Sequence, residues 1–247
     1  HFTVGEICWI RNNSGLLVAG DLRPSFQQIN EILAIDTSAH TIKLRYPLYK
    51  DLTGGRIASN STSSRADPLG VTGQCIRDYS LSNLRVISSV ERWTGWGGSL
   101  RGVLHDLWIE ADGALKINGF SHGSMSRIHS KWSTALFELA YFSHDSNFYD
   151  IHSQWYAGSG YTSALTMNEH AHHLTFRDMR ILPGGGWAGD HGIFFNAVTD
   201  CVVDNVSFRA LIPSSAKVAA VAMTTPADAD AICQRNVARN IQSHIAN

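Results

Sequence analysis

Asp106-Leu107-Trp108-Ile109, Arg127-Ile128-His129-Ser130 and Asp150-Ile151-His152-Ser153 are three copies of one short pattern, and this pattern decides the fold. In each copy a polar residue precedes an apolar pivot, and one outward residue separates the pivot from a second inward residue. Two further copies follow at 178–181 and 205–208. The period-two alternation inside each copy is typical of a β-strand and not of a helix.

The copies recur at a spacing that predicts a solenoid. The pivots lie 21 to 28 residues apart, at Leu84, Leu107, Ile128, Ile151, Met179 and Val206. A further apolar residue stands three positions before each of the last five pivots: Leu104, Met125, Phe148, Phe176 and Val203. The Leu/Asn consensus of leucine-rich repeats is absent, so we expect a parallel β-helix whose equivalent residues stack about 4.8 Å apart.

A second column of strands accompanies the first. It comprises 114–118, 135–139, 164–168 and 192–196, and continues to 220–224, while the first column extends back to 83–86 and forward to 240–243. The varying repeat length indicates that loops leave the solenoid at fixed corners. Glu138 falls at an inward position of the second column, which indicates either a one-residue slip of that strand, the interpretation we favour, or a buried acid.

The N-terminal part has a different pattern. Strands are predicted at 4–10, 29–35 and 41–44, with a turn at 36–40, which together form a small antiparallel meander. The Gly/Ser/Thr-rich segment 53–73 is expected to be a long loop or an inserted hairpin. We therefore divide the chain into 1–73, the meander and its loop, and 74–247, the solenoid. No polar cap follows the last repeat, so we expect the solenoid to be incomplete at its C-terminal end.

Composition excludes several classes of partner. The net charge of −1 over 247 residues does not favour nucleic acid or an anionic membrane, and no apolar run is long enough to span a bilayer. Cys8, Cys75, Cys201 and Cys233 form no CxxC and have no metal-ligand spacing. Buried free thiols are expected at Cys201 and Cys233, and one disulfide among the four cysteines is the alternative.

The outward positions of the first column define a surface that we call the outer strip. One residue after each pivot these are Arg85, Trp108, His129, His152, Arg180, Ser207 and Gln242, and three residues after they are Glu110, Lys131, Gln154, Leu182, Arg209 and His244. Aromatic rings and ionisable groups of both signs fit a groove for a polar polymer better than a merely solvated face. Two long loops bring further candidate binding residues to one corner: Trp155, Tyr156, Tyr161, Trp187, Asp190 and His191.

The repeat pattern, preceded by Phe2-Thr3-Val4-Gly5-Glu6-Ile7-Cys8-Trp9-Ile10, resembles the pectate-lyase-like right-handed parallel β-helix superfamily. This group holds polysaccharide lyases, glycoside hydrolases, epimerases and phage tailspike depolymerases. The resemblance covers most of the chain and rests on architecture, because no catalytic motif of a particular family is present. It implies an all-β right-handed solenoid, a polysaccharide or oligosaccharide lying across the strands, and a secreted, phage-associated or cell-surface location. The resemblance also allows a homotrimer.

Two chemistries compete for the outer strip. β-Elimination on a uronic acid needs a base and cations beside the carboxylate, and His129, Lys131, His152 and Arg180 supply these groups. Hydrolysis needs two carboxylates, for which Glu110 and Asp190 are the best pair. We expect an extracellular enzyme that cleaves an acidic polysaccharide by β-elimination, with substrate bound by Trp108, Gln154, Arg209 and the loop residues. A glycoside hydrolase or fructan-converting enzyme, and a noncatalytic tailspike or adhesin, are the alternatives.

No cofactor is expected, and no motif supports a Ca²⁺ site. His129 and His152 occupy equivalent places on adjacent repeats, where a base or a stacked ladder is favoured over a metal pair because no carboxylate lies between them. Asn168-Glu169-His170-Ala171-His172-His173 has the residue types of a metal site. Asn118, Asn168 and Asn196 are equivalent, however, so we interpret this column as an asparagine ladder and the histidines as a solvated turn, with metal binding as the alternative.

Overall fold

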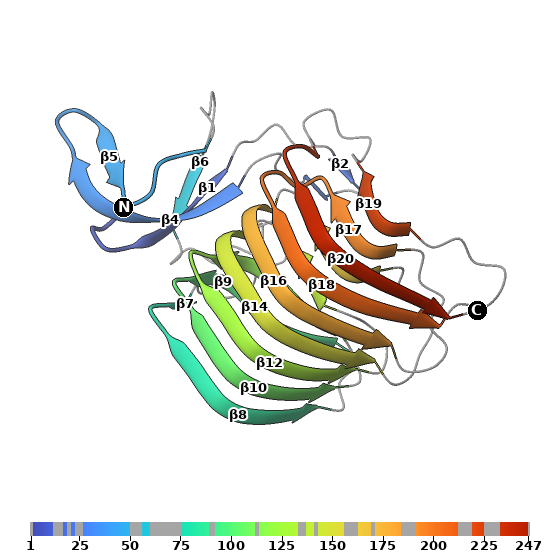
Figure 1. The fold of residues 1–247 in the computed structure, drawn as a ribbon. Helices are drawn as coiled ribbons and strands as arrows, with labels where there is room; N and C mark the ends of the chain where they lie inside the picture. Colours follow the sequence, from blue (N-terminus) through green and yellow to red (C-terminus); the bar gives the residue numbers. More distant parts are fainter. Residues whose placement is uncertain are drawn as a thin grey trace.

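The computed structural model confirms the predicted fold class: an all-β parallel solenoid with a small antiparallel sheet at its N-terminal side (Figure 1). It describes residues 2–11, 17–18, 21–22, 27–49, 56–59, 76–88, 92–111, 114–132, 137–140, 143–155, 163–168, 171–183, 191–211, 219–224 and 233–246. Within these ranges there is no helix, and thus none long and apolar enough to cross a membrane.

The first stack of parallel strands is the predicted first column. It comprises β8 (Ser80–Ser88), β10 (Val103–Ala111), β12 (Ser124–Trp132), β14 (His144–Trp155), β16 (His172–Pro183), β18 (Val202–Leu211) and β20 (Val237–Ala246). Leu107 pairs with Leu84 and Ile128, and Ile151 pairs with Ile128 and Met179, so the pivots are aligned as predicted. Figure 1 shows these strands as successive rungs along one side of the solenoid.

The second stack lies on the other side. It comprises β9 (Arg92–Leu100), β11 (Ala114–Ser121), β13 (Phe137–Ala140), β15 (Ser163–Asn168), β17 (His191–Asn196) and β19 (Ala219–Thr224), with β7 (Ile76–Arg77) paired to the end of β9. Phe137 pairs with Leu115, and Glu138 pairs with Lys116. The register is therefore shifted by one residue from the predicted column, which confirms the strand slip at Glu138.

Residues with positive φ explain why two inward residues stand three positions apart. Asp106, Asp150 and Asp178 have φ of 55°, 54° and 55°, and each immediately precedes a pivot. A left-handed residue bends the strand, so the apolar side chains on either side of it both face the core although an alternating strand would send them to opposite faces. The bend also separates the outer strip from the short segment before it.

Stacked apolar side chains fill the solenoid. Phe120, Phe148, Phe176 and Phe195 are among the largest fully buried residues. The rings of Phe148 and Phe176 lie 4.8 Å apart at 11°, an offset stack between adjacent coils. The same column continues through Leu104, Met125 and Val203, which are also buried. Each coil therefore buries its inward residues against the coils beside it.

The N-terminal meander is present as predicted. β1 (Ile7–Arg11) pairs antiparallel with β4 (Gln27–Asp36), and β4 pairs with β5 (Thr41–Leu44). A fourth strand, β6 (Arg56–Ser59), pairs with β1 and lies inside the segment predicted as a loop or hairpin. β2 (Leu17–Val18) and β3 (Asp21–Leu22) pair with each other as a short antiparallel ribbon.

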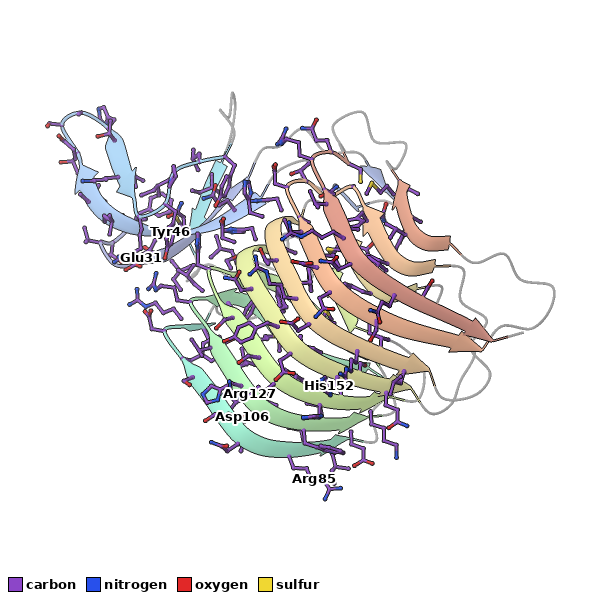
Figure 2. The ribbon with its side chains drawn as sticks, in the orientation of Figure 1. Glu31, Tyr46, Arg85, Asp106, Arg127 and His152 are labelled. Carbon is purple, nitrogen blue, oxygen red and sulfur yellow. The ribbon has the colours of Figure 1, made fainter. Side chains whose placement is uncertain are left out.

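Polar groups join the meander to the solenoid. The Ile29 amide donates to His144 Nε2 at 3.2 Å, and Arg101 donates to Glu31 at 2.8 Å. Figure 2 shows Glu31 and Tyr46 where the meander meets the coils. Cys8 and Cys201 are buried free thiols, which confirms the prediction for Cys201. Cys233 is also a free thiol as expected, but it is only half-buried, and Cys75 lies outside the described residues.

Candidate functional site

The outer strip lies on the outer face of the first stack, and its N-terminal half is a row of rings. Trp108 is 46% exposed, and its ring stacks on that of His129 with centroids 5.6 Å apart. His129 in turn meets His152 edge to face at 5.1 Å. The strand register predicted this order, because Trp108 pairs with His129 and His129 pairs with His152. An exposed indole next to two imidazoles offers flat faces to a sugar ring.

Glu110 is held as a carboxylate by cations of the same strip. Arg85 donates to it at 3.2 Å, and Lys131 Nζ lies 3.7 Å from its other oxygen. The Arg85 hydrogen bond lowers the pKa of Glu110, and the charge of Lys131 adds to the effect. Glu110 is thus a poor proton donor near neutral pH, and Arg85 and Lys131 already share their charge with it.

A pocket of about 410 Å³ opens in the C-terminal half of the strip. Four neighbouring strands, β14, β16, β18 and β20, supply its lining: Asp150, His152, Asp178, Met179, Arg180, Asn205, Ser207 and Gln242. The register explains the composition, since His152, Arg180, Ser207 and Gln242 are successive partners across the stack. Two carboxylates, an imidazole, a guanidinium and two amides therefore face one hollow.

Contacts inside the pocket order its side chains. His152 Nε2 lies 3.4 Å from Asp150 Oδ1, and Asn205 donates to Asp178 at 2.5 Å. In the part of the chain that the structure describes, Arg180 has no ion pair, and it is exposed. Its guanidinium is available to an anionic ligand, whereas Arg85 at the other end of the strip is neutralised.

Asp150 and Asp178 were not among the residues that the sequence predicted as catalytic. They occupy equivalent positions, because Ile151 pairs with Met179 directly after them. The sequence contains the signal, since both are the polar residue that opens a repeat. The repeat pattern alone does not show which way this residue faces, and the bend at positive φ brings it to the border of the outer strip.

The structure describes only some of the remaining predicted residues. Gln154 is exposed on β14 beyond His152. Trp155, His191 and Arg209 belong to β14, β17 and β18, but their side chains lie outside the described part. Tyr156, Tyr161, Trp187 and Asp190 fall outside the described residues. The loop contribution to binding, and the pairing of Glu110 with Asp190, stay predictions.

Two other residues that directly precede pivots, on adjacent coils, bind each other. Arg127 donates to both oxygens of Asp106, at 2.6 and 2.8 Å, across adjacent coils. Figure 2 labels both residues at this corner. Hydrogen bonds from Arg127 and then His105 lower the pKa of Asp106. This bidentate pair fixes the corner of the coils and leaves Asp106 and Arg127 occupied with each other.

The Asn168–His173 tract is partly corrected. Asn196 donates to Asn168 at 3.0 Å, which confirms an asparagine contact between those two coils. His172, however, is buried and packs edge to face on Tyr49 at 4.4 Å, so the solvated-turn interpretation is wrong for it. The reason is the meander, whose Tyr49 segment covers this corner. Glu169 and His170 lie outside the described residues.

No protein-family model matches this chain, and no curated protein sequence matches it either.

Proposed function

We propose that this protein is an extracellular enzyme that cleaves an acidic polysaccharide in the pocket over β14, β16, β18 and β20. The observation that carries the proposal is the pocket itself, where ionisable groups from neighbouring coils converge beside a row of exposed rings. A polymer lying across the parallel strands would meet Trp108 and His129 on one side and the pocket on the other. The resemblance to carbohydrate-active β-helices supports the same substrate class.

β-Elimination is the chemistry that we favour. His152 would take the proton next to the uronate carboxylate, and the electron pair of that C–H bond would form a C=C bond while the glycosidic C–O bond breaks and the leaving oxygen takes a proton from water. Asp150, 3.4 Å from His152 Nε2, would orient the ring and stabilise the imidazolium. Arg180 would pair with the uronate carboxylate and stabilise the negative charge that develops as the proton leaves. The support for an acidic substrate is that this exposed guanidinium has no ion pair among the described residues.

Hydrolysis is the second candidate, and one observation favours it. Asp150 and Asp178 line the same pocket from equivalent positions on adjacent strands. Equivalent residues of neighbouring strands lie about 4.8 Å apart in the backbone. Glycosidases use two carboxylates separated by roughly 5–9.5 Å, so this pair suits that chemistry better than Glu110, which is neutralised by Arg85.

The test is a panel of acidic and neutral polysaccharides followed by absorbance of the unsaturated uronate and by reducing ends. We expect both signals to rise together, and Arg180→Gln and His152→Gln to lower the rate by about 100-fold or more. Lys43→Gln, which removes an exposed cation on β5, is the matched control and should keep full activity. Reducing ends without absorbance, lost in Asp150→Asn and Asp178→Asn, would replace elimination by hydrolysis. Binding without cleavage of any substrate would refute the enzyme and leave a binding module.

A further inference from the structure

We propose that His122, His144 and Asp145 bind a divalent transition-metal ion of the zinc class where the N-terminal meander meets the solenoid. This site lies at the corner before the outer strip and does not involve the pocket over β14–β20. It is therefore independent of the proposed polysaccharide chemistry. The three residues come from two successive coils, whose segments meet at the pairing of Ser121 with His144.

The spacing of the ligand atoms fits a metal ion. One nitrogen of each histidine and one Asp145 oxygen all lie within 4.8 Å of one another. His144 Nδ1 is 2.9 Å from Asp145 Oδ2, and His122 Nε2 is 3.6 Å from the same oxygen. Zinc–ligand bonds of about 2.0–2.1 Å in a tetrahedron place neighbouring ligand atoms about 3.3 Å apart. The observed distances bracket that value.

The solenoid backbone fixes the position of two of the three proposed ligands. His122 and Asp145 are equivalent corner residues of adjacent coils, and both have positive φ, at 52° and 48°. Non-glycine residues in this region are uncommon, and the solenoid pairing on both sides keeps them there. The result is a preformed arrangement in which an imidazole and a carboxylate leave neighbouring coils at the same corner.

The polar atoms of this cluster are largely shielded from water. The His144 side chain is fully buried, and His122 Nε2 is a buried atom without a hydrogen-bond partner in the described residues. Neutral imidazole is the form that coordinates a metal, and a cation between the two rings would stabilise the Asp145 carboxylate.

Outer residues hold the ligands in place. The Tyr46 ring stacks on His122 at 3.6 Å, and the His172 ring stacks on His144 at 4.9 Å. Tyr49 donates its hydroxyl to Asp145 Oδ2, which places a further oxygen beside the proposed ion. Such stacking and hydrogen bonding around a metal ligand fixes its orientation. Two of these groups, Tyr46 and Tyr49, follow the meander, so the site spans both parts of the molecule.

The proton on His144 provides a second test of the proposal. Without a metal, His144 Nε2 accepts the Ile29 amide at 3.2 Å, so the ring proton is on Nδ1, 2.9 Å from Asp145. Coordination through Nδ1 requires that proton to move to Nε2, where it faces the Ile29 N–H. The amide then loses its acceptor. Metal binding and the Ile29 contact therefore exclude each other.

The experiment titrates Co²⁺, and then Zn²⁺ as competitor, into protein stripped of metal with a chelator. We expect one ion per chain with the strong visible absorption of a tetrahedral site, and about 100-fold weaker binding in His122→Ala and Asp145→Asn. His129→Gln, which alters the histidine pair of the outer strip, is the control and should bind normally. In the wild type, hydrogen exchange at the Ile29 amide should become faster when the metal is added.

The outcomes separate the proposal from its competitors. A weak octahedral spectrum, or binding that is lost in His129→Gln and kept in Asp145→Asn, overturns it. Asp145→Asn keeps the shape of the side chain, so circular dichroism matching the wild type ensures that its lost binding reports on coordination. An unchanged Ile29 exchange rate on saturation with metal would also contradict coordination through His144 Nδ1.

Discussion

In each described strand of the first stack, the residue before the pivot is polar and has a left-handed backbone conformation. Asn83, Asp106, Arg127, Asp150, Asp178, Asn205 and Asn240 all have positive φ. Asn and Asp tolerate this region because their short side chains bond locally, and Arg127 compensates by its two bonds to Asp106. The corner therefore requires a residue that tolerates positive φ, and the apolar pattern alone does not reveal this requirement.

Replacing one of these residues tests the requirement directly. Asn205→Val should lower the free energy of unfolding by about 1–2 kcal/mol, because a β-branched residue at φ 53° is strained. Asn205→Gly relieves that strain while losing the hydrogen bond to Asp178, so its effect should be about 1 kcal/mol or less. Urea unfolding measures both. Ser207→Val, two residues along the same strand, is the control, and an equal loss there would show that backbone strain is not the cause.

At the scale of the element, each strand of the first stack packs its inward side chains against those of neighbouring coils. Phe148 on β14 packs between Phe120 and Phe176, with ring centroids 5.7 and 4.8 Å away. The adjacent Tyr149 is exposed on the other face of the same strand. The element therefore owes its stability to inward rings from neighbouring coils.

Truncating the middle ring should destabilise the whole solenoid. Phe148→Ala should cost about 3–5 kcal/mol of unfolding free energy, because it removes buried ring contacts and leaves a cavity that neighbouring coils cannot close. Tyr149→Ala, the matched control on the opposite face, should change it by about 0.5 kcal/mol or less. Chemical denaturation followed by far-ultraviolet circular dichroism gives both values. A loss for Tyr149→Ala as large as that for Phe148→Ala would mean that the two faces are equally important.

The strands were predictable because the inward residues repeat in the sequence. Leu107, Ile128 and Ile151 carry the period-two signal, and parallel stacking follows once the coils are superposed. At 137–140 the strand is displaced by the one-residue slip favoured at Glu138, and β9 at 92–100 was not predicted. The outer strip followed from the same alignment, since every second residue must face outward.

Other parts of the candidate sites were not predictable, for two physical reasons. The bend at Asp150 and Asp178 depends on φ, and no apolar period reports a single left-handed residue. The burial of His144 and His172 depends on the meander, which covers that corner from a distant part of the chain. A signal did exist, because His122, Asp145 and His173 each stand six residues before a pivot.

At the scale of the whole molecule, Glu31 links the meander to the solenoid. Its carboxylate is 9% exposed and accepts hydrogen bonds from Arg45 and Arg101 at 2.8 Å each, with Arg77 at 3.4 Å. Arg101 also makes two bonds to Asp78 on the solenoid side, at 2.6 and 2.7 Å. One carboxylate thus neutralises cations from both parts, and its loss would leave three guanidiniums facing one another.

This arrangement predicts how stability depends on pH. Burial raises the pKa of Glu31, but the hydrogen bonds from Arg45 and Arg101 outweigh burial and lower the pKa below its ordinary 4.5. Since the folded pKa is depressed, the stabilisation is complete above pH 4.5 and is lost as the pH falls through the folded pKa. Glu31→Gln should therefore cost about 1.5–3 kcal/mol at pH 6 and progressively less relative to the wild type as the pH falls below 4.5.

Urea unfolding at pH 6 and at pH 3.5 gives the comparison, and a double-mutant cycle identifies the partner. Glu31→Gln combined with Arg101→Gln should cost less than the two single changes added together, because each removes the same contact across the joint. Lys43→Gln, on an exposed position of β5, should behave additively with Glu31→Gln. If the cost of Glu31→Gln were the same at both pH values, the Glu31 charge would not be what holds the meander to the solenoid, and the stacking of Tyr46 on His122 would have to account for the joint instead.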